Sequence, residues 1–261
     1  MVIKLLCAVL LVCVSPGLVM AFDNTGLQPI SPYGVFSTFS TESLPKNKVG
    51  LEVTAERAID PEFYRFGIKG AYGLTDAIEF NFSAPYIFKY ANAVDGPEDF
   101  SFGWKHRVYD EGKYGPSLAY IVSTSINNGR KEFSTNGRIG VGFIASKRVG
   151  PFKGHLNIFA ANPGTAALKS EVSFSGGIDF SAANNLNLLG ELVIKKGHTT
   201  KEYDQVETRL GYRIKTTDFL YTTLGVGIDL KDKGPEYRFI LSVSLTSPHK
   251  KTVIKRIYEE E

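Results

Sequence analysis

The chain has 261 residues, of which 43% are hydrophobic and 22% are charged, and its formal net charge at pH 7 is +3. Intrinsic disorder is excluded because aromatic residues make up 12% of the chain, and disordered segments contain few of them. A helical multi-span membrane protein needs several apolar runs of about 20 residues. Here the longest apolar run, residues 5–14, occurs once. The nearly balanced charge also argues against a dedicated nucleic-acid-binding protein.

Residues 1–21 are predicted to be a secretory signal peptide. Lys4 supplies the positive start, residues 5–14 form a short apolar region, and small residues follow at a cleavage site. This apolar region is too short to anchor the chain in a bilayer. Both cysteines, Cys7 and Cys13, lie inside it, so the exported chain would contain no disulfide. A first strand or helix of the core is the alternative interpretation.

From residue 49 to 246 the dominant pattern is strict alternation of apolar and polar residues. Ile78 and Phe80, for example, fall on one parity, and Glu79 and Asn81 fall on the other. Successive side chains of a strand point to opposite faces, so each such segment has one apolar and one polar face. The pattern predicts about twelve strands of about ten to fourteen residues and no amphipathic helix. In chain order they are 48–57, 62–72, 77–88, 99–109, 115–127, 136–148, 152–161, 170–181, 185–196, 203–214, 219–230 and 236–246.

The lengths of the strands and of their connections indicate the fold. Strands of soluble proteins usually have about five or six residues, whereas tilted membrane-spanning strands need about nine to eleven. Short connections, such as 73–76 and 149–151, alternate with longer polar ones, such as 90–98 and 126–135. An even number of strands with short turns at one end and longer loops at the other is typical of bacterial outer-membrane barrels. The sequence therefore predicts an all-β, antiparallel, up-and-down transmembrane barrel. A soluble periplasmic sandwich is the alternative, because alternation alone does not separate the two.

The predicted domain organisation follows from these boundaries. Residues 1–21 are the signal peptide, 22–47 an N-terminal extension, 48–246 the barrel and 247–261 a charged C-terminal tail. The extension is rich in Ser, Thr, Pro and aromatic residues. We expect it to act either as a periplasmic tether or as a plug inside the barrel.

The polar parity of the strands carries the charged residues, with more basic than acidic groups. A charge on the lipid face costs about 2–4 kcal/mol at the bilayer midplane, whereas a water-facing lumen tolerates it. We therefore predict that these side chains line the lumen: Arg65, Lys69, Glu79, Lys105, Arg107, Arg138, Glu191, Lys195, Glu207, Arg209, Arg213 and Arg238. Glycines inside the strands, such as Gly103, Gly177 and Gly225, are interpreted as points of barrel curvature.

Three stretches resemble a known family. Residues 73–86 (Gly-Leu-Thr-Asp-Ala-Ile-Glu-Phe, running to Ala-Pro-Tyr) resemble the "GLTD…E…PY" hairpin of the outer-membrane family labelled "MetA-pathway of phenol degradation". Residues 99–107 resemble that family's next strand, and residues 43–49 resemble the entry to its first strand. The resemblance implies an outer-membrane barrel that transports hydrophobic or aromatic small molecules, and it brings no catalytic residues. The chain departs from outer-membrane barrels in general, which commonly end on an aromatic residue read by the assembly machinery, because residues 247–261 follow the last strand.

The residues suggest no cofactor or metal chemistry, and we do not expect an enzyme. The four histidines are scattered, and no cysteine remains after cleavage to join them as a ligand. The predicted function is an outer-membrane channel for passive uptake or efflux of small molecules. Its partners would be outer-membrane lipid, a small-molecule solute and the barrel-assembly machinery, and not nucleic acid. The alternatives are a non-transporting structural or surface-interaction barrel and an outer-membrane phospholipase that uses His106 or His155.

Overall fold

The computed structural model describes residues 26–90, 93–197 and 205–247. The predicted signal peptide, residues 1–21, lies outside the described residues, as do most of the C-terminal tail and most of the connection 197–202. Among the described residues, no helix is long and apolar enough to cross a membrane.

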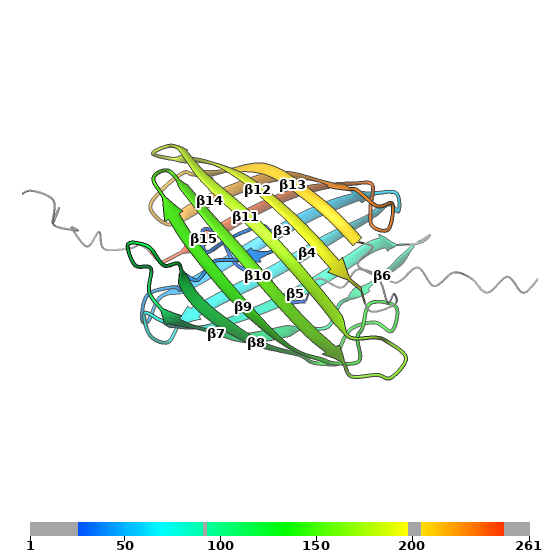
Figure 1. Ribbon diagram of the computed structural model, residues 1–261. Coiled ribbons are helices and arrows are strands. Elements are labelled where there is room, and N and C mark those ends of the chain that lie inside the picture. The colour runs from blue at the N-terminus through cyan, green and yellow to red at the C-terminus, as the bar shows by residue number, and fades with distance from the viewer. Residues whose placement is uncertain (1–25, 91–92, 198–204, 248–261) are drawn as a thin grey trace, which may run out of the picture.

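Twelve long antiparallel strands form one closed barrel within the described residues (Figure 1). The sheet runs in the order β4-β3-β15-β14-β13-β12-β11-β10-β9-β8-β7-β5, and pairing of β4 with β5 closes it. The first and last long strands pair with each other, with Thr54 opposite Ser242. The predicted all-β barrel is therefore confirmed. The alternative, a sandwich of two sheets, is wrong, because the strands form a single closed sheet.

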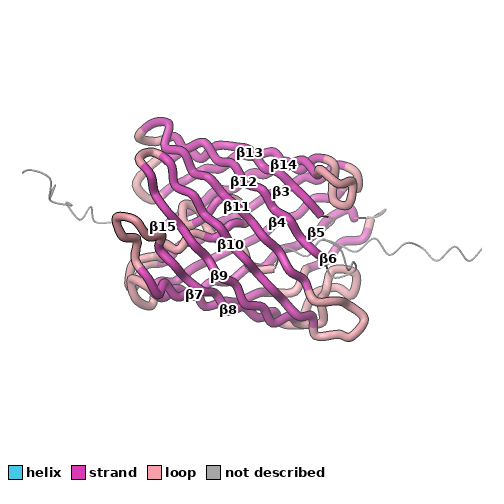
Figure 2. Tube along the Cα trace, viewed as in Figure 1, coloured by secondary structure: helices cyan, strands magenta, loops and turns pink. Residues whose placement is uncertain are grey.

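The predicted strand boundaries agree with the structure to within two residues. The barrel strands are β3 (Val49–Ile59), β4 (Phe63–Gly73), β5 (Ile78–Tyr90), β7 (Ser101–Tyr109), β8 (Ser117–Ser125), β9 (Arg138–Val149), β10 (Phe152–Pro163), β11 (Glu171–Ala183), β12 (Leu186–Lys196), β13 (Gln205–Lys215), β14 (Leu220–Asp229) and β15 (Tyr237–Thr246). Their connections gather at the two ends of the barrel (Figure 2). We call these the short-turn end, which includes residues 150–151, and the loop end, which includes residues 126–137.

Side chains of the barrel strands are arranged apolar outside and polar inside. In β3, Leu51 and Val53 are exposed by 42% and 50%, whereas the Glu52, Thr54 and Glu56 side chains between them are buried. Exposure and polarity are thus reversed relative to a soluble sheet, because the charged face is the one that the closed sheet encloses.

Among the described residues, three short strands lie outside the predicted set. The strands β1 (Gly34–Val35) and β2 (Thr38–Phe39) form a hairpin within the N-terminal segment, residues 26–47. The strand β6 (Val94–Pro97) pairs with the loop end of β5. Segments of two to four residues are too short for alternation to reveal, so the sequence pattern could not predict them.

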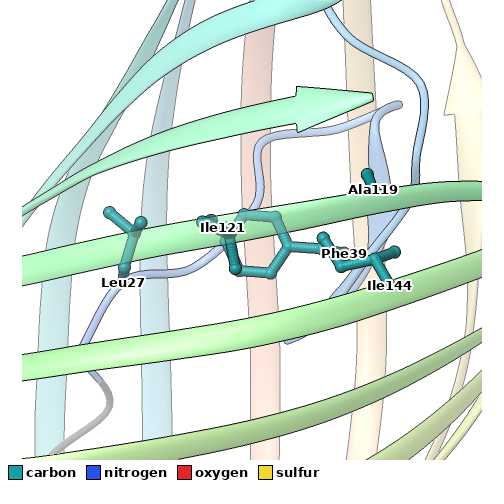
Figure 3. Close-up of a cluster of buried hydrophobic side chains, with 5 residues drawn as sticks. All are labelled: Leu27, Phe39, Ala119, Ile121 and Ile144. Carbon is teal, nitrogen blue, oxygen red and sulfur yellow. The ribbon is translucent and has the colours of Figure 1, made fainter. Parts of the chain in front are cut away.

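Within the part of the chain that the structure describes, three apolar clusters inside the barrel join its wall to segments that fold inward. In one of them, Leu27 and Phe39 of the N-terminal segment pack against Ala119, Ile121 and Ile144 of the wall (Figure 3). The second contains N-terminal and wall residues: Ile30, Tyr33, Leu44 and Ala71. The third joins Phe133 of the connection 126–137 to the wall: Ala58, Phe63, Ile87 and Phe133. The interior is therefore packed rather than an empty bore.

Candidate functional site

The outer face of the barrel is an apolar belt with aromatic residues toward both ends. Large exposed hydrophobic side chains lie on strand after strand, among them Val53, Ile68, Phe102, Val122, Ile139, Phe143, Leu156, Ile178, Leu192, Leu210, Val226 and Leu241. Tyr86 and Phe88 lie toward the loop end, and their rings are 4.5 Å apart. Phe152 and Phe180 stack at 4.6 Å at the short-turn end. Such a belt, flanked by aromatic girdles, matches the outward surface of a membrane barrel.

The enclosed face carries ion pairs instead. In the described part of the chain, nine interior cations pair with nine carboxylates. The cations are Arg65, Lys69, Lys105, Arg138, Lys153, Lys195, Arg209, Arg213 and Arg238, and the carboxylates are Glu42, Glu52, Glu56, Glu79, Glu98, Glu171, Asp179, Glu191 and Glu207. The excess of basic groups expected from the strand pattern is therefore offset, in part by carboxylates from outside the strands.

Seven of these groups form one continuous series of ion pairs across the inner wall. Successive N–O distances are 2.6, 3.3, 3.0, 3.2, 2.7 and 3.0 Å along Glu98, Arg65, Glu56, Arg238, Glu207, Arg209 and Glu191. Removal of one partner from a buried pair leaves an uncompensated charge and costs about 3–5 kcal/mol. This series of ion pairs therefore links strands that are far apart in sequence.

The structure places the twelve predicted lumen residues as follows. Nine are buried on the inner wall: Arg65, Lys69, Glu79, Lys105, Arg138, Glu191, Arg209, Arg213 and Arg238. Lys195 and Glu207 are on the same wall and slightly more exposed. Arg107 lies at the short-turn end, where it pairs with Asp110 at 2.7 Å and donates to the Asp76 carbonyl at 3.0 Å.

Sequence reasoning missed several members of this network. Glu52, Glu56, Lys153, Glu171 and Asp179 share the inward parity, which could have revealed them. Two others come from outside the barrel strands: Glu42 and Glu98. Alternation contains no signal for these two, because their positions depend on how the chain folds back into the barrel.

The N-terminal segment is held by carboxylates of the wall. Three inner carboxylates accept its backbone N–H groups: Glu52 from Ser31 at 2.8 Å, Glu191 from Thr38 at 2.6 Å and Glu79 from Leu44 at 2.6 Å. Asn157 adds a two-way contact, accepting from the Phe39 N–H at 2.7 Å and donating to its carbonyl at 2.9 Å. Hydrogen bonds to charged groups contribute about 1.5–3 kcal/mol each, so the segment is firmly attached.

Glu42 is the charged anchor that the segment itself provides. Its carboxylate pairs with Lys153, and Lys105 donates to its backbone carbonyl at 2.5 Å. Burial alone would raise the pKa of the Glu42 carboxyl, but the adjacent Lys153 ammonium more than offsets this and holds the pKa below its usual value. Glu42 is therefore ionised at neutral pH and contributes one member of an ion pair.

Inward-facing glycines make room for the N-terminal segment. A Cβ atom at Gly103 would overlap the Leu27 side chain, and one at Gly225 would overlap the Phe36 ring. A Cβ at Gly177 would lie 3.1 Å from the Cβ of Val35. Close approach of the chain's own N-terminal segment therefore explains these three glycines, where curvature alone was expected.

The loop end of the lumen has two unlike halves. On the side of β9 to β15, the described residues surround a cavity of about 120 Å³, and Ser37 and Phe39 of the N-terminal segment lie in its lining. Its walls mix charged, polar and phenyl groups: Arg138, Asn157, Phe159, Glu171, Ser173, Lys195, Gln205, Glu207 and Arg209. It could hold a small molecule that offers both hydrogen-bonding and apolar surface.

The connection 126–137 covers the other half. Asp99 accepts four hydrogen bonds from it: from the N–H groups of Gly129 and Thr135 at 3.0 and 2.7 Å, and from the hydroxyls of Ser134 and Thr135 at 2.7 and 2.9 Å. Phe133 adds its ring to an apolar cluster and is only 2% exposed. One carboxylate and one aromatic side chain thus contribute to holding the connection at the barrel mouth, together with backbone contacts such as Arg130 N–H to the Pro97 carbonyl at 2.9 Å.

The two described histidines contact hydroxyl groups in different places. His155 Nδ1 lies 2.8 Å from Ser146 Oγ, inside the barrel, where Ser146 also accepts the Thr41 N–H at 3.1 Å. His106 Nδ1 lies 3.1 Å from the Tyr120 hydroxyl. The Ser146 and His155 side chains are buried against the N-terminal segment, so this pair serves to hold that segment. Within the described residues, no group of three His, Cys, Asp or Glu side chains could hold a metal ion.

Comparison with known proteins supports the fold. No family model and no curated protein matches the chain. Among solved structures, the COG4313 outer membrane channel from Pseudomonas putida F1 superimposes with a TM-score of 0.63 at 13% identity, covering 84% of this chain and 99% of that chain. The NanC porin gives 0.58 at 9% identity over 75% and 98% of the two chains, and the KdgM porin 0.53 at 15% over 77% and 99%. The chain therefore shares the barrel fold of outer-membrane channels, and the resemblance to the phenol-degradation family stays a prediction.

Proposed function

We propose that the protein is an outer-membrane barrel that conducts small solutes passively. One observation carries this proposal: apolar side chains cover the outside of the closed sheet, while paired charges line the inside. Lipid can replace water around such a belt, and a charged inner wall is stable only where water or paired charges surround it. The predicted signal peptide would export the chain, and the barrel-assembly machinery would insert it.

The N-terminal segment acts in this proposal as a plug. Carboxylates on β3, β5 and β12 hold its backbone, and removal of the segment would leave polar groups for a solute to contact. The ion pairs balance, so the wall supports passage of small polar solutes without a preference for anions. Hydrophobic or aromatic compounds, which the family resemblance implies, would have to pass through the lumen along this charged wall.

Single-channel recording in planar bilayers tests the proposal. The refolded wild-type chain is compared with a variant that lacks residues 26–44, and heat-modifiable gel migration verifies that both barrels are folded. We expect small or brief conductance steps from the wild type and larger, sustained steps from the deletion variant. Intact barrels without conductance in either protein would contradict channel activity.

A non-transporting barrel is the second candidate function. The observation in its favour is the packed interior, where three apolar clusters and the ion pairs fill the space between the walls. A structural or surface-interaction protein would need such rigidity and would not need a pathway for solutes through the lumen. The deletion variant separates the two, because a purely structural barrel would lose stability on deletion without gaining conductance.

A further inference from the structure

A β-bulge redirects one lysine at the loop end of β5. Alternation along the strand would turn Lys89 inward, as it does Ile87. The register shifts between Ile87 and Tyr90, and Lys89 adopts a φ of 58°. As a result Lys89 is exposed on the outer side, whereas the Tyr90 ring packs inward, 5.6 Å from that of Phe133. A non-glycine residue at positive φ is strained, and bulges commonly serve to re-aim a side chain.

The redirected lysine completes a group of two cations around one tyrosine. The Lys89 ammonium lies 5.5 Å from the centroid of the Tyr64 ring, and the Arg57 guanidinium lies 5.7 Å from it. Both distances fit cation–π contacts. Glu62 neighbours the group and pairs with Arg57 at 3.4 Å, but their side chains are 58% and 53% exposed. Such an exposed pair is weak, so a stronger anion can compete with Glu62.

An apolar groove of about 420 Å³ starts at this group and runs along the outer wall. It crosses β4, β3, β15, β14 and β13, and its outward lining consists of Ala55, Arg57, Tyr64, Phe66, Leu210, Tyr212, Leu224, Val226, Phe239 and Leu241. Arg57 is two residues from the loop end of β3, whereas Leu210 is five residues from the loop end of β13. The groove therefore descends from two cations at the loop end into the apolar belt.

We propose that this surface binds a phosphorylated acyl glycolipid of the outer leaflet. The phosphorylated head group contacts Arg57 and Lys89, which reach Tyr64 from the two neighbouring strands, and one acyl chain lies in the groove below them. Charge complementarity selects this occupant, because only a ligand with an anionic head and an apolar tail fits both parts of the surface. The proposal rests on the outer-membrane location proposed above. The longer loops of outer-membrane barrels are extracellular, which places the loop end in the outer leaflet.

Native mass spectrometry of the folded, full-length protein, titrated with diphosphoryl lipid A in detergent, measures the affinity. We expect the double variant Arg57→Gln, Lys89→Gln to bind lipid A about 25-fold more weakly, or about fivefold per charge removed. The Ala55→Phe variant, which fills the groove, is expected to weaken binding as well. All three side chains point outward, so the barrel fold is expected to persist, and gel migration verifies this.

Lys113→Gln is the matched control, because Lys113 also lies over a tyrosine, Tyr114, at 5.4 Å, but at the short-turn end. It should leave lipid A affinity unchanged. Equal losses of lipid A affinity in the control and the double variant would contradict the proposed binding site. Unchanged affinity in the double variant would contradict it as well. Equally tight binding of phosphatidylcholine would also overturn it, because that lipid carries no net charge. Absence of the protein from the outer-membrane fraction would instead contradict the proposed location.

Discussion

The two halves of the loop end differ in what occupies them. Across β3 to β8, the connection 126–137 folds over the mouth, and Asp99 and Phe133 bind it there. Across β9 to β15, the described residues instead surround a cavity that reaches the N-terminal segment. The covered half combines apolar packing with hydrogen bonds, whereas the lining of the other half mixes charged and polar groups with apolar side chains such as Leu27, Phe39 and Phe159. In the channel proposed above, a solute in this cavity would contact Ser37 and Phe39 of the N-terminal segment.

The largest effect is expected at Arg238, which joins the two halves. Arg238 contacts Glu56 at 3.0 Å on the covered side and Glu207 at 3.2 Å on the open side. The Arg238→Ala substitution should lower the free energy of unfolding by about 3–5 kcal/mol, because buried carboxylates lose a partner. Urea unfolding followed by Trp104 fluorescence measures this. The exposed Arg57→Ala substitution should change stability by less than about 1 kcal/mol, and equal effects from the two would contradict the bridging role.

A smaller effect is expected from Asp99→Asn, which would uncover the closed half. The neutral amide cannot accept all four hydrogen bonds, so we expect the connection 126–137 to loosen and trypsin to cleave it faster at Arg130 or Lys131. The stability loss should be about 1–3 kcal/mol. Asp229→Asn is the control in the open half, where Asp229 accepts the N–H groups of Lys233 and Gly234 at 2.6 and 2.7 Å. Unchanged cleavage in the Asp99 variant would show that the cover does not depend on this carboxylate.

The smallest expected effect is the dependence of channel opening on pH, which involves Glu42 of the N-terminal segment. The pKa of Glu42 is lowered in the folded protein, so its contribution is present above the unfolded-state pKa and is lost as the pH falls through the folded-state value. Channel openings of the wild type should therefore become more frequent only in the acid range below the usual carboxyl pKa. Glu42→Gln should raise the opening frequency at neutral pH and remove that part of the acid response. A response that persists in this variant would point to the wall carboxylates.

Much of this architecture could be predicted from residue order. The alternation of Ile78 and Phe80 with Glu79 and Asn81 reveals the strand, its two faces and its boundaries, because side chains of a strand alternate with a period of two. The same parity reveals that Arg238 and Glu191 point away from lipid. It does not reveal that these charges neutralise one another, because pairing depends on which strands become neighbours and on register.

Other features depended on the folded chain alone. The positions of Glu42 and Glu98 follow from segments that fold back into the barrel, and neither segment has a repeating pattern. Lys89 is more instructive, because a local register shift reverses the face that alternation assigns to it. Repetition along the chain therefore determined the strands and their two faces, since that choice is made residue by residue. Closure of the sheet decided the ion pairs and the buried N-terminal segment, since each requires groups from distant parts of the chain to meet. The pairing of β5 with β6 decided the outward lysine.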